Sequence, residues 1–402
     1  MIRISFDFEL ISLEKSFENR PERSLDEEVR KFKESIKDGK IKWTEEEKIE
    51  LETDQFDTDE TLKNTKLHFA DMPHFEFDGD LSDFVDDNYK IIGFDESSIT
   101  RSGTYAKIGC FKFGEGQVTF QNGKYKKKLI MYKPINAYIE DNEHKLTIYR
   151  TVIENFIKTI KKDFYKANLK DKVDKLLEWF EDTYKKKIDT HIEAHNFYYP
   201  SLGHLIDRIR TADEILKSLI RIKDESNWGK NKKVIFLGDG IQMFRQHIFP
   251  PSAFTELFYR FIEIYDIKYY SFSKTCRLRD AQGNFILPIW SEILENKKFL
   301  VELPDLSAYT KSKAYITRLQ KASAALRFDI CDSLDTKDAI YIVKNLIPYS
   351  PRGYPLSLIG AHEASTLLAS EYNKLEATFL ELQFNKKTKK YTQEWRKKVL
   401  GE

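Results

Sequence analysis

Two aspartates stand at the predicted ends of two apolar strands. Asp95 follows the apolar run in KIIGFD, and Asp239 follows the apolar run in VIFLGD. A carboxylate at the tip of a buried strand is held rigidly, and two such tips side by side would bind Mg²⁺ or Mn²⁺ through hard oxygen ligands. The glycines that flank Asp239 would let a phosphate group approach the backbone closely. Aspartate also ends strands and caps helices for structural reasons, so that explanation stays open for each residue alone.

Two further residues have side chains suited to the same chemistry. Lys274 follows the strand-like segment IKYYSFSKTC and could contact a phosphate or stabilise developing negative charge. His362 lies in YPLSLIGAHEAS, where we expect it to open a C-terminal helix and to serve as a metal ligand or acid–base group. A lone lysine or histidine is more often structural, so each gains meaning only with the aspartates.

The elements before Asp239 read as strands followed by helices. Apolar clustering predicts strands over 90–100, 106–114 and 127–139, joined by turns at 101–103 and 115–116 into an antiparallel meander. Helical periodicity then predicts helices over 146–165, 168–195 and 202–222.

The elements from Asp239 onward alternate between strands and helices. We expect strands over 232–244 and 267–276 with a helix over 252–266 between them. Strand-like runs follow at 299–304, 314–319 and 339–346, before a closing helix over 360–382. This order predicts an α/β fold, a mixed sheet flanked by helices.

Charge and periodicity divide the chain into three parts. Residues 1–88 read as a charged, partly helical N-terminal extension that ends in a linker over 71–88, and 383–402 as a basic C-terminal tail. Between them, 89–382 forms the predicted catalytic domain, with a helical insertion at about 140–200. The stretch 44–88 is acidic, whereas 124–128, 230–233 and 386–390 are basic.

Composition limits the class of protein. The 66 Lys and Arg residues nearly cancel the 65 Asp and Glu residues, but nucleic-acid binding depends on how charge is distributed and not on its sum. The three cysteines form no CxxC pair, which argues against a zinc site or a disulfide framework. The N-terminus carries no signal-peptide pattern, and no apolar run approaches the ~18 residues of a membrane span. We therefore expect a cytoplasmic protein without a membrane segment.

Four short motifs, taken in order, resemble the NurA nuclease family. They are DES at 95–97, LGDG at 237–240, FSK at 272–274 and YPLSLIGAH at 354–362, and the resemblance covers roughly 88–380. It implies an RNase H-like core related to the Piwi domain, a homodimer, and manganese-dependent cleavage of DNA. It also implies partnership with the hexameric HerA ATPase, in DNA end processing or anti-phage defence.

The resemblance also implies roles for single residues. Asp95, Asp239 and His362 would be ligands of Mn²⁺ or Mg²⁺, with two ions expected, and Lys274 would face the scissile phosphate. The family also places a catalytic, metal-binding glutamate on the helix before the second aspartate strand, and Glu214 matches it best.

The position of Glu214 on its helix leaves alternatives open. At about 100° per residue, Glu214 lies roughly 180° from the apolar stripe that contains Leu205 and Leu216. It would face either solvent or a cleft on the outer side of the helix. Glu154, on the first helix after the strands, is the alternative.

Two departures from the family pattern motivate a rival hypothesis. Glu96 stands where the family usually has glycine, and Ile241 where a serine commonly follows Asp-Gly. A catalytically inactive adaptor that docks on the ATPase ring would tolerate both. A third hypothesis is a guide-dependent Piwi-like effector, but the chain is short for guide-anchoring domains. DNA would be held by basic residues and by stacking on aromatics such as Trp228 or Tyr354.

Overall fold

The structure is a computed structural model of the 402-residue chain. It describes residues 72–77, 89–102, 107–121, 124–138, 171, 174–180, 182, 202–226, 234–240, 251–274, 276, 285–303, 312–331 and 333–383. The predicted helix at 146–165, Glu154, Trp228, Ile241 and nearly all of the acidic stretch 44–88 lie outside these residues.

The described strands form one ten-stranded mixed sheet in the order β1-β8-β9-β10-β7-β6-β2-β3-β4, with β5 also paired to β3. The strands are β1 (His74–Glu76), β2 (Lys90–Ser102), β3 (Lys107–Gln121), β4 (Lys124–Met131), β5 (Ile135–Tyr138), β6 (Val234–Asp239), β7 (Tyr269–Ser273), β8 (Phe299–Glu302), β9 (Ser312–Arg318) and β10 (Leu326–Cys331).

The middle of this sheet has the topology that the motifs implied. Strands β2, β3 and β4 form an antiparallel meander, and β6 and β7 then run parallel to β2. Three antiparallel strands followed by two parallel ones make an RNase H-like core. The predicted mixed sheet flanked by helices is therefore confirmed.

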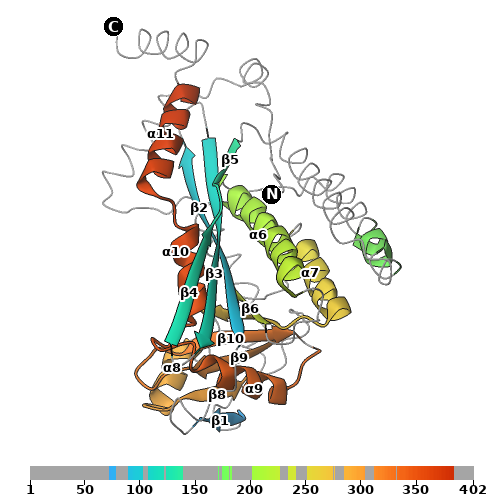
Figure 1. Ribbon diagram of the computed structural model, residues 1–402, viewed down its shortest axis with the longest axis vertical. Helices are drawn as coiled ribbons and strands as arrows, with labels where there is room; N and C mark the ends of the chain where they lie inside the picture. Colours follow the sequence, from blue (N-terminus) through green and yellow to red (C-terminus); the bar gives the residue numbers. More distant parts are fainter. Residues whose placement is uncertain are drawn as a thin grey trace, which may run out of the picture.

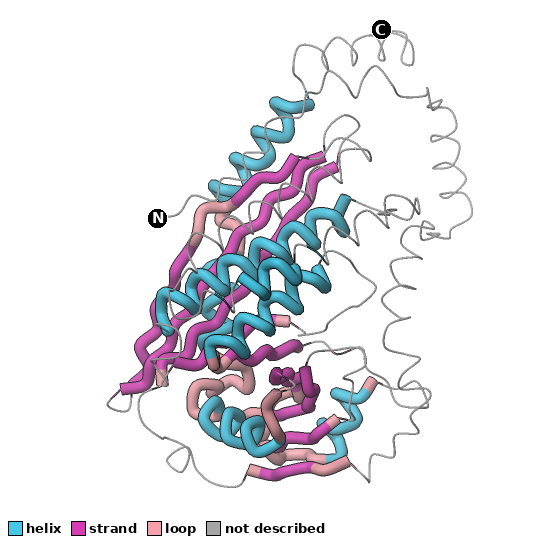
Figure 2. The backbone as a smooth tube through the Cα atoms, turned by 90° about the vertical axis from the view of Figure 1, so that its right-hand side faces the viewer, coloured by secondary structure: helices cyan, strands magenta, loops and turns pink. Residues whose placement is uncertain are grey.

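Helices cover both faces of the sheet. They are α6 (Leu202–Ser226), α7 (Pro251–Tyr265), α8 (Ile286–Ile293), α9 (Thr336–Leu346), α10 (Leu356–Ser365) and α11 (Ala369–Gln383). Figure 1 shows α10 on one side of the long strands β2–β4 and α6 and α7 on the other. In Figure 2, α6 runs along the strands. No helix of the described part is both long and apolar enough to cross a membrane.

The apolar core follows from the alternation of side chains along the buried strands. Phe94 of β2 stacks on Phe113 of β3 and on Phe236 of β6, with ring centroids 5.8 and 6.1 Å apart. All three rings are nearly inaccessible to solvent. Because successive residues of a strand point to opposite faces, Gly93 and Asp95 face α10 while Phe94 and Glu96 face α6.

Several predicted boundaries in the meander are wrong. β2 continues to Ser102, so Asp95 lies in the middle of a strand and not at its end. β3 runs unbroken through the predicted turn at 115–116, because Gly114 and Gly116 serve close packing against α10 and not chain reversal. The predicted linker over 71–88 contains β1, which pairs with β8.

The C-terminal part differs more strongly from the prediction. The expected strand at 339–346 belongs to helix α9, which begins with a capping box between Asp335 and Asp338. The closing helix is two helices, α10 and α11, interrupted after Ser365. Helix α8 and strand β10 were not predicted.

Candidate active site

The two predicted aspartates occupy the same level of neighbouring strands. Phe94 of β2 and Gly238 of β6 are register partners in a parallel pair, and Asp95 and Asp239 directly follow them. Side chains at matching positions of parallel neighbours project from the same face. The negative charge of Asp95 contributes to raising the pKa of Asp239. The two carboxylates are therefore close enough to repel each other.

Helix α10 brings two polar side chains to Asp95. His362 Nδ1 lies 2.9 Å from Asp95 Oδ2, and the Ser365 hydroxyl donates to the same oxygen at 2.9 Å. The helix reaches this position because the sheet presents glycines to it: a Cβ at Gly114 or Gly116 would collide with the backbone of α10. His362 lies in the second half of α10, which begins at Leu356, so the prediction that it opens the helix is wrong. Its side chain is 59% exposed and accessible to a substrate.

Asp239 has two partners, one of them unexpected. The Tyr354 hydroxyl donates to Asp239 Oδ1 at 2.8 Å, and Lys274 Nζ lies 3.4 Å from Asp239 Oδ2. The Lys274 ammonium also sits over the Tyr354 ring, 4.4 Å from its centroid. Burial raises the pKa of Asp239, although the Tyr354 hydroxyl and Lys274 both act to lower it.

Tyr354 has a different role from the one considered for it. It was a candidate for stacking on DNA bases, but only 8% of it is exposed. A buried ring is not an open stacking platform. Its hydroxyl fixes one oxygen of Asp239, a role that the sequence did not reveal because 115 residues separate the two side chains.

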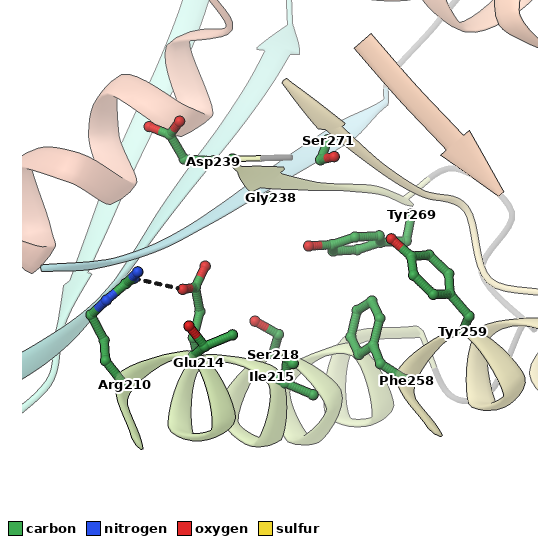
Figure 3. A pocket seen from close by; sticks show the side chains of 12 residues that line it. Arg210, Glu214, Ile215, Ser218, Gly238, Asp239, Phe258, Tyr259, Tyr269 and Ser271 are labelled. Atoms are coloured by element: carbon green, nitrogen blue, oxygen red, sulfur yellow. Dashed lines mark hydrogen bonds and ion pairs between the residues drawn. The ribbon is translucent and has the colours of Figure 1, made fainter. Parts of the chain in front are cut away.

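Glu214 approaches from the opposite side of the sheet. It projects from α6 and pairs with Arg210, whose Nη1 lies 3.1 Å from Glu214 Oε2. In Figure 3 the Glu214 carboxylate points toward the end of β6, whereas that of Asp239 points away from α6. Burial raises the pKa of Glu214 to about 8; Arg210 opposes this, and repulsion from Asp95 and Asp239 adds to it. Glu214 therefore faces a cleft and not bulk solvent, and its carboxylate interacts electrostatically with those of Asp95 and Asp239.

A cavity of about 220 Å³ opens beside these residues (Figure 3). Glu214, Arg210 and Asp239 line its polar part, and Phe258, Tyr259 and Tyr269 line its aromatic part. A Cβ at Gly238 would collide with the Tyr269 hydroxyl, so any larger residue there would require the Tyr269 side chain to shift.

The side chains of the candidate ligands have the chemistry that a hard divalent cation prefers, but their arrangement fits such an ion less well. Three carboxylates and an imidazole are ligands that Mn²⁺ or Mg²⁺ accepts, and the mutual repulsion of the carboxylates is what a cation would offset. Among the described residues, however, no group of three or more His, Cys, Asp or Glu side chains is arranged to hold a metal ion. Each aspartate also accepts a hydrogen bond from the protein, Asp95 from the Ser365 hydroxyl and Asp239 from the Tyr354 hydroxyl.

Comparison with known proteins finds solved structures that are similar to this chain at low sequence identity and low TM-score. No protein-family model and no curated protein matches the chain. A crystal structure of the NurA nuclease from Sulfolobus solfataricus has 15% identity and a TM-score of 0.43, covering 86% of this chain and 98% of that one. A structure of NurA bound to dAMP and manganese has 12% identity and a TM-score of 0.32, covering 85% and 95%. A structure of NurA with manganese has 12% identity and a TM-score of 0.31, covering 72% and 88%. At these values the likeness carries no argument about activity.

Proposed function

We propose that this chain is a divalent-metal-dependent nuclease that hydrolyses phosphodiester bonds in DNA. One observation carries the proposal: Asp95 and Asp239 lie level on neighbouring parallel strands, with a histidine beside one and a lysine beside the other. Glu214 adds a third carboxylate from across the end of β6.

Asp95, Asp239, Glu214 and His362 would hold Mn²⁺ or Mg²⁺, with two ions expected from the motif resemblance. When bound, the metal lowers the pKa of a coordinated water and offsets negative charge on the phosphate. The protein contributes rigid placement of the carboxylates: β2 and β6 fix their backbones, while Tyr354 and Ser365 orient one oxygen of each aspartate.

Lys274 is suited to act on the phosphate. Its side chain is 52% exposed and contacts Asp239 at a single distance of 3.4 Å. The ion pair with Asp239 and the cation–π contact with Tyr354 each contribute on the order of 1 kcal/mol, so the ammonium can turn toward an incoming phosphate at small cost. There it would stabilise the negative charge that develops as the P–O bond breaks.

The adaptor hypothesis is the second candidate, and one observation speaks against it. Glu96, one of the departures that motivated it, is directed to the α6 face and pairs with Lys217. Asp95 faces α10. Glu96 therefore does not obstruct the carboxylate pair. We also propose that the chain forms a homodimer and binds a HerA-type hexameric ATPase. These two proposals are supported by the sequence motifs alone.

Cleavage of end-labelled linear DNA with Mn²⁺ tests the proposal. We would compare wild type with Asp239→Asn and Asp95→Asn, each with and without a HerA-type ATPase and ATP. Glu292→Gln, at an exposed position of helix α8, is a matched control that removes a carboxylate outside the candidate site. Metal-dependent products that persist in the control and vanish in both aspartate variants are expected. If neither wild type nor the variants cleave DNA, even with the ATPase and ATP present, the adaptor hypothesis is favoured.

A further inference from the structure

Between α6 and β2 lies a cluster of buried charges that the proposed reaction does not use. Lys217 of α6 forms ion pairs with Asp213, one turn earlier, and with Glu96 of β2, whose Oε1 lies 3.4 Å from Lys217 Nζ. The side chains of Glu96 and Asp213 are fully buried, and that of Lys217 is 13% exposed. We call these three residues and Arg210 the α6 clamp.

The clamp lies beside the candidate ligands on both elements. Glu96 directly follows Asp95, and Asp213 directly precedes Glu214. Arg210 joins the two sides: it donates to the Glu96 carbonyl oxygen at 2.8 Å and to Glu214 Oε2 at 3.1 Å. A single guanidinium thus connects the backbone next to Asp95 with the carboxylate of Glu214.

Buried ion pairs are a costly way to hold a helix on a sheet. Desolvation of the charges consumes much of the Coulombic attraction, and apolar residues of similar volume often pack as well or better. Ion pairs differ from apolar contacts in being directional, because they fix the rotation and the axial position of a helix. One residue of rotation on α6 would turn Glu214 by about 100° away from the cleft.

We propose that Lys217 and Arg210 are positioning residues, which hold α6 in the register that points Glu214 at the Asp95–Asp239 pair and thereby set the affinity for the divalent cation. This inference rests on the proposed function. Residues that orient metal ligands without touching the metal typically change metal affinity or activity about 10- to 100-fold when they are removed.

The chain offers a matched control on the same helix. Arg221 of α6 binds the fully buried Glu115 of β3 through two hydrogen bonds of 2.6 and 3.1 Å. It holds the same helix on the same sheet, but it lies seven residues beyond Glu214, about 10 Å along the helix axis. Its loss should loosen α6 without changing the direction of Glu214.

The test measures Mn²⁺ binding to the full-length protein by calorimetry and by the electron paramagnetic resonance signal of the ion, together with the unfolding temperature. The variants are Lys217→Met, Arg210→Gln and the control Arg221→Met. Arg210→Gln guards against misfolding, because the Arg210 side chain is already 25% exposed. We expect Lys217→Met and Arg210→Gln to weaken Mn²⁺ affinity 10- to 100-fold, and DNA cleavage to recover toward wild type at saturating Mn²⁺. Arg221→Met should lower the unfolding temperature but leave Mn²⁺ affinity within twofold.

Two results would overturn the inference in distinguishable ways. If wild type binds Mn²⁺ and the clamp variants bind it as tightly as Arg221→Met does, the clamp serves stability alone, while the proposed function stands. If wild type binds no Mn²⁺ and cleaves no DNA, the proposed function fails, and the inference fails with it.

Discussion

The Tyr354 hydroxyl lies 2.8 Å from Asp239 Oδ1 and donates a hydrogen bond to it. The bond favours the ionised carboxylate, so it lowers the pKa of Asp239 against the raising effect of burial. It ties the segment before α10 to the end of β6, two parts of the chain that are remote in sequence.

Tyr354→Phe should move the acidic limb of the pH–activity profile to higher pH. Asp239 must be ionised to bind a cation, and its pKa in the folded protein is already raised, so activity is lost as pH falls through that pKa. A hydrogen bond to a charged group contributes roughly 1.5 kcal/mol, and one pKa unit corresponds to about 1.4 kcal/mol. We therefore expect a shift of about one pH unit. Tyr349→Phe removes a buried hydroxyl that binds the Tyr89 carbonyl oxygen, and it should leave the limb in place.

Mn²⁺ should stabilise the folded protein through the aspartate pair. A ligand present at about 100 times its dissociation constant adds roughly 2.7 kcal/mol to the free energy of unfolding. We expect this gain in wild type, its reversal by a chelator, and its absence in Asp239→Asn, as measured by thermal unfolding with and without Mn²⁺. An equal gain in Asp239→Asn would place the bound metal elsewhere.

Gly116→Ala should destabilise the protein and lower its activity together. A Cβ at this position of β3 would meet the backbone of α10 at Ser357 and Ala361. Neither atom belongs to a flexible side chain, so the helix must move. Overpacking costs typically about 1–3 kcal/mol, and we expect the upper end of that range in denaturant unfolding. Because α10 carries His362, the rate of DNA cleavage should fall as well. An unchanged unfolding midpoint would contradict the close approach of α10.

Glu371→Gln should reduce stability in a pH-dependent way. Glu371 accepts a hydrogen bond of 2.7 Å from Lys112, whose side chain is 1% exposed. Burial raises the pKa of Glu371, but the hydrogen bonds from Lys112 and from the Leu368 N–H, together with the positive charge of Lys112, lower it by more, so the net pKa is lowered. The stabilisation is therefore complete above the unfolded pKa of about 4.3 and is lost as pH falls through the lowered folded value.

We expect a loss of roughly 2 kcal/mol at neutral pH for Glu371→Gln. This is less than the about 3–5 kcal/mol for breaking a fully buried pair, because the Thr366 carbonyl oxygen still accepts from Lys112. The difference from wild type should shrink as pH falls through the lowered folded pKa of Glu371, because Glu371 itself then becomes neutral. Glu376→Gln breaks a pair with Arg101 in which both side chains are 32% exposed, and it should cost less than about 1 kcal/mol. Denaturant unfolding as a function of pH measures both effects.

The sequence alone determined the candidate chemistry and the fold class. Asp95 and Asp239 follow short apolar runs, and both runs form buried strands as their pattern predicts. Lys274 and His362 were also identified from short motifs, and both lie within hydrogen-bonding or ion-pairing distance of an aspartate. Local signals of this kind depend only on neighbouring residues.

In some segments the sequence contained a signal for the correct element, but a second signal in the same segment favoured a different one. The apolar run at 339–346 reads as a strand, yet the Asp335–Asp338 capping box marks the start of a helix. Its buried apolar residues also have helical spacing: they are Ala339, Ile342, Val343 and Leu346. The glycines of β3 suggest a turn in sequence, but tight packing against a helix uses the same residue type.

Only the tertiary structure decided how the site is assembled. Strand pairing sets Asp95 level with Asp239, and the approach of α10 brings His362 to Asp95. The charges between α6 and β2 orient Glu214, which helical periodicity by itself left facing either solvent or a cleft. Apart from the Arg210–Glu214 pair within α6, these relationships join residues more than a hundred positions apart, and their energy comes from packing, burial and charge pairing that exist only after the chain has folded.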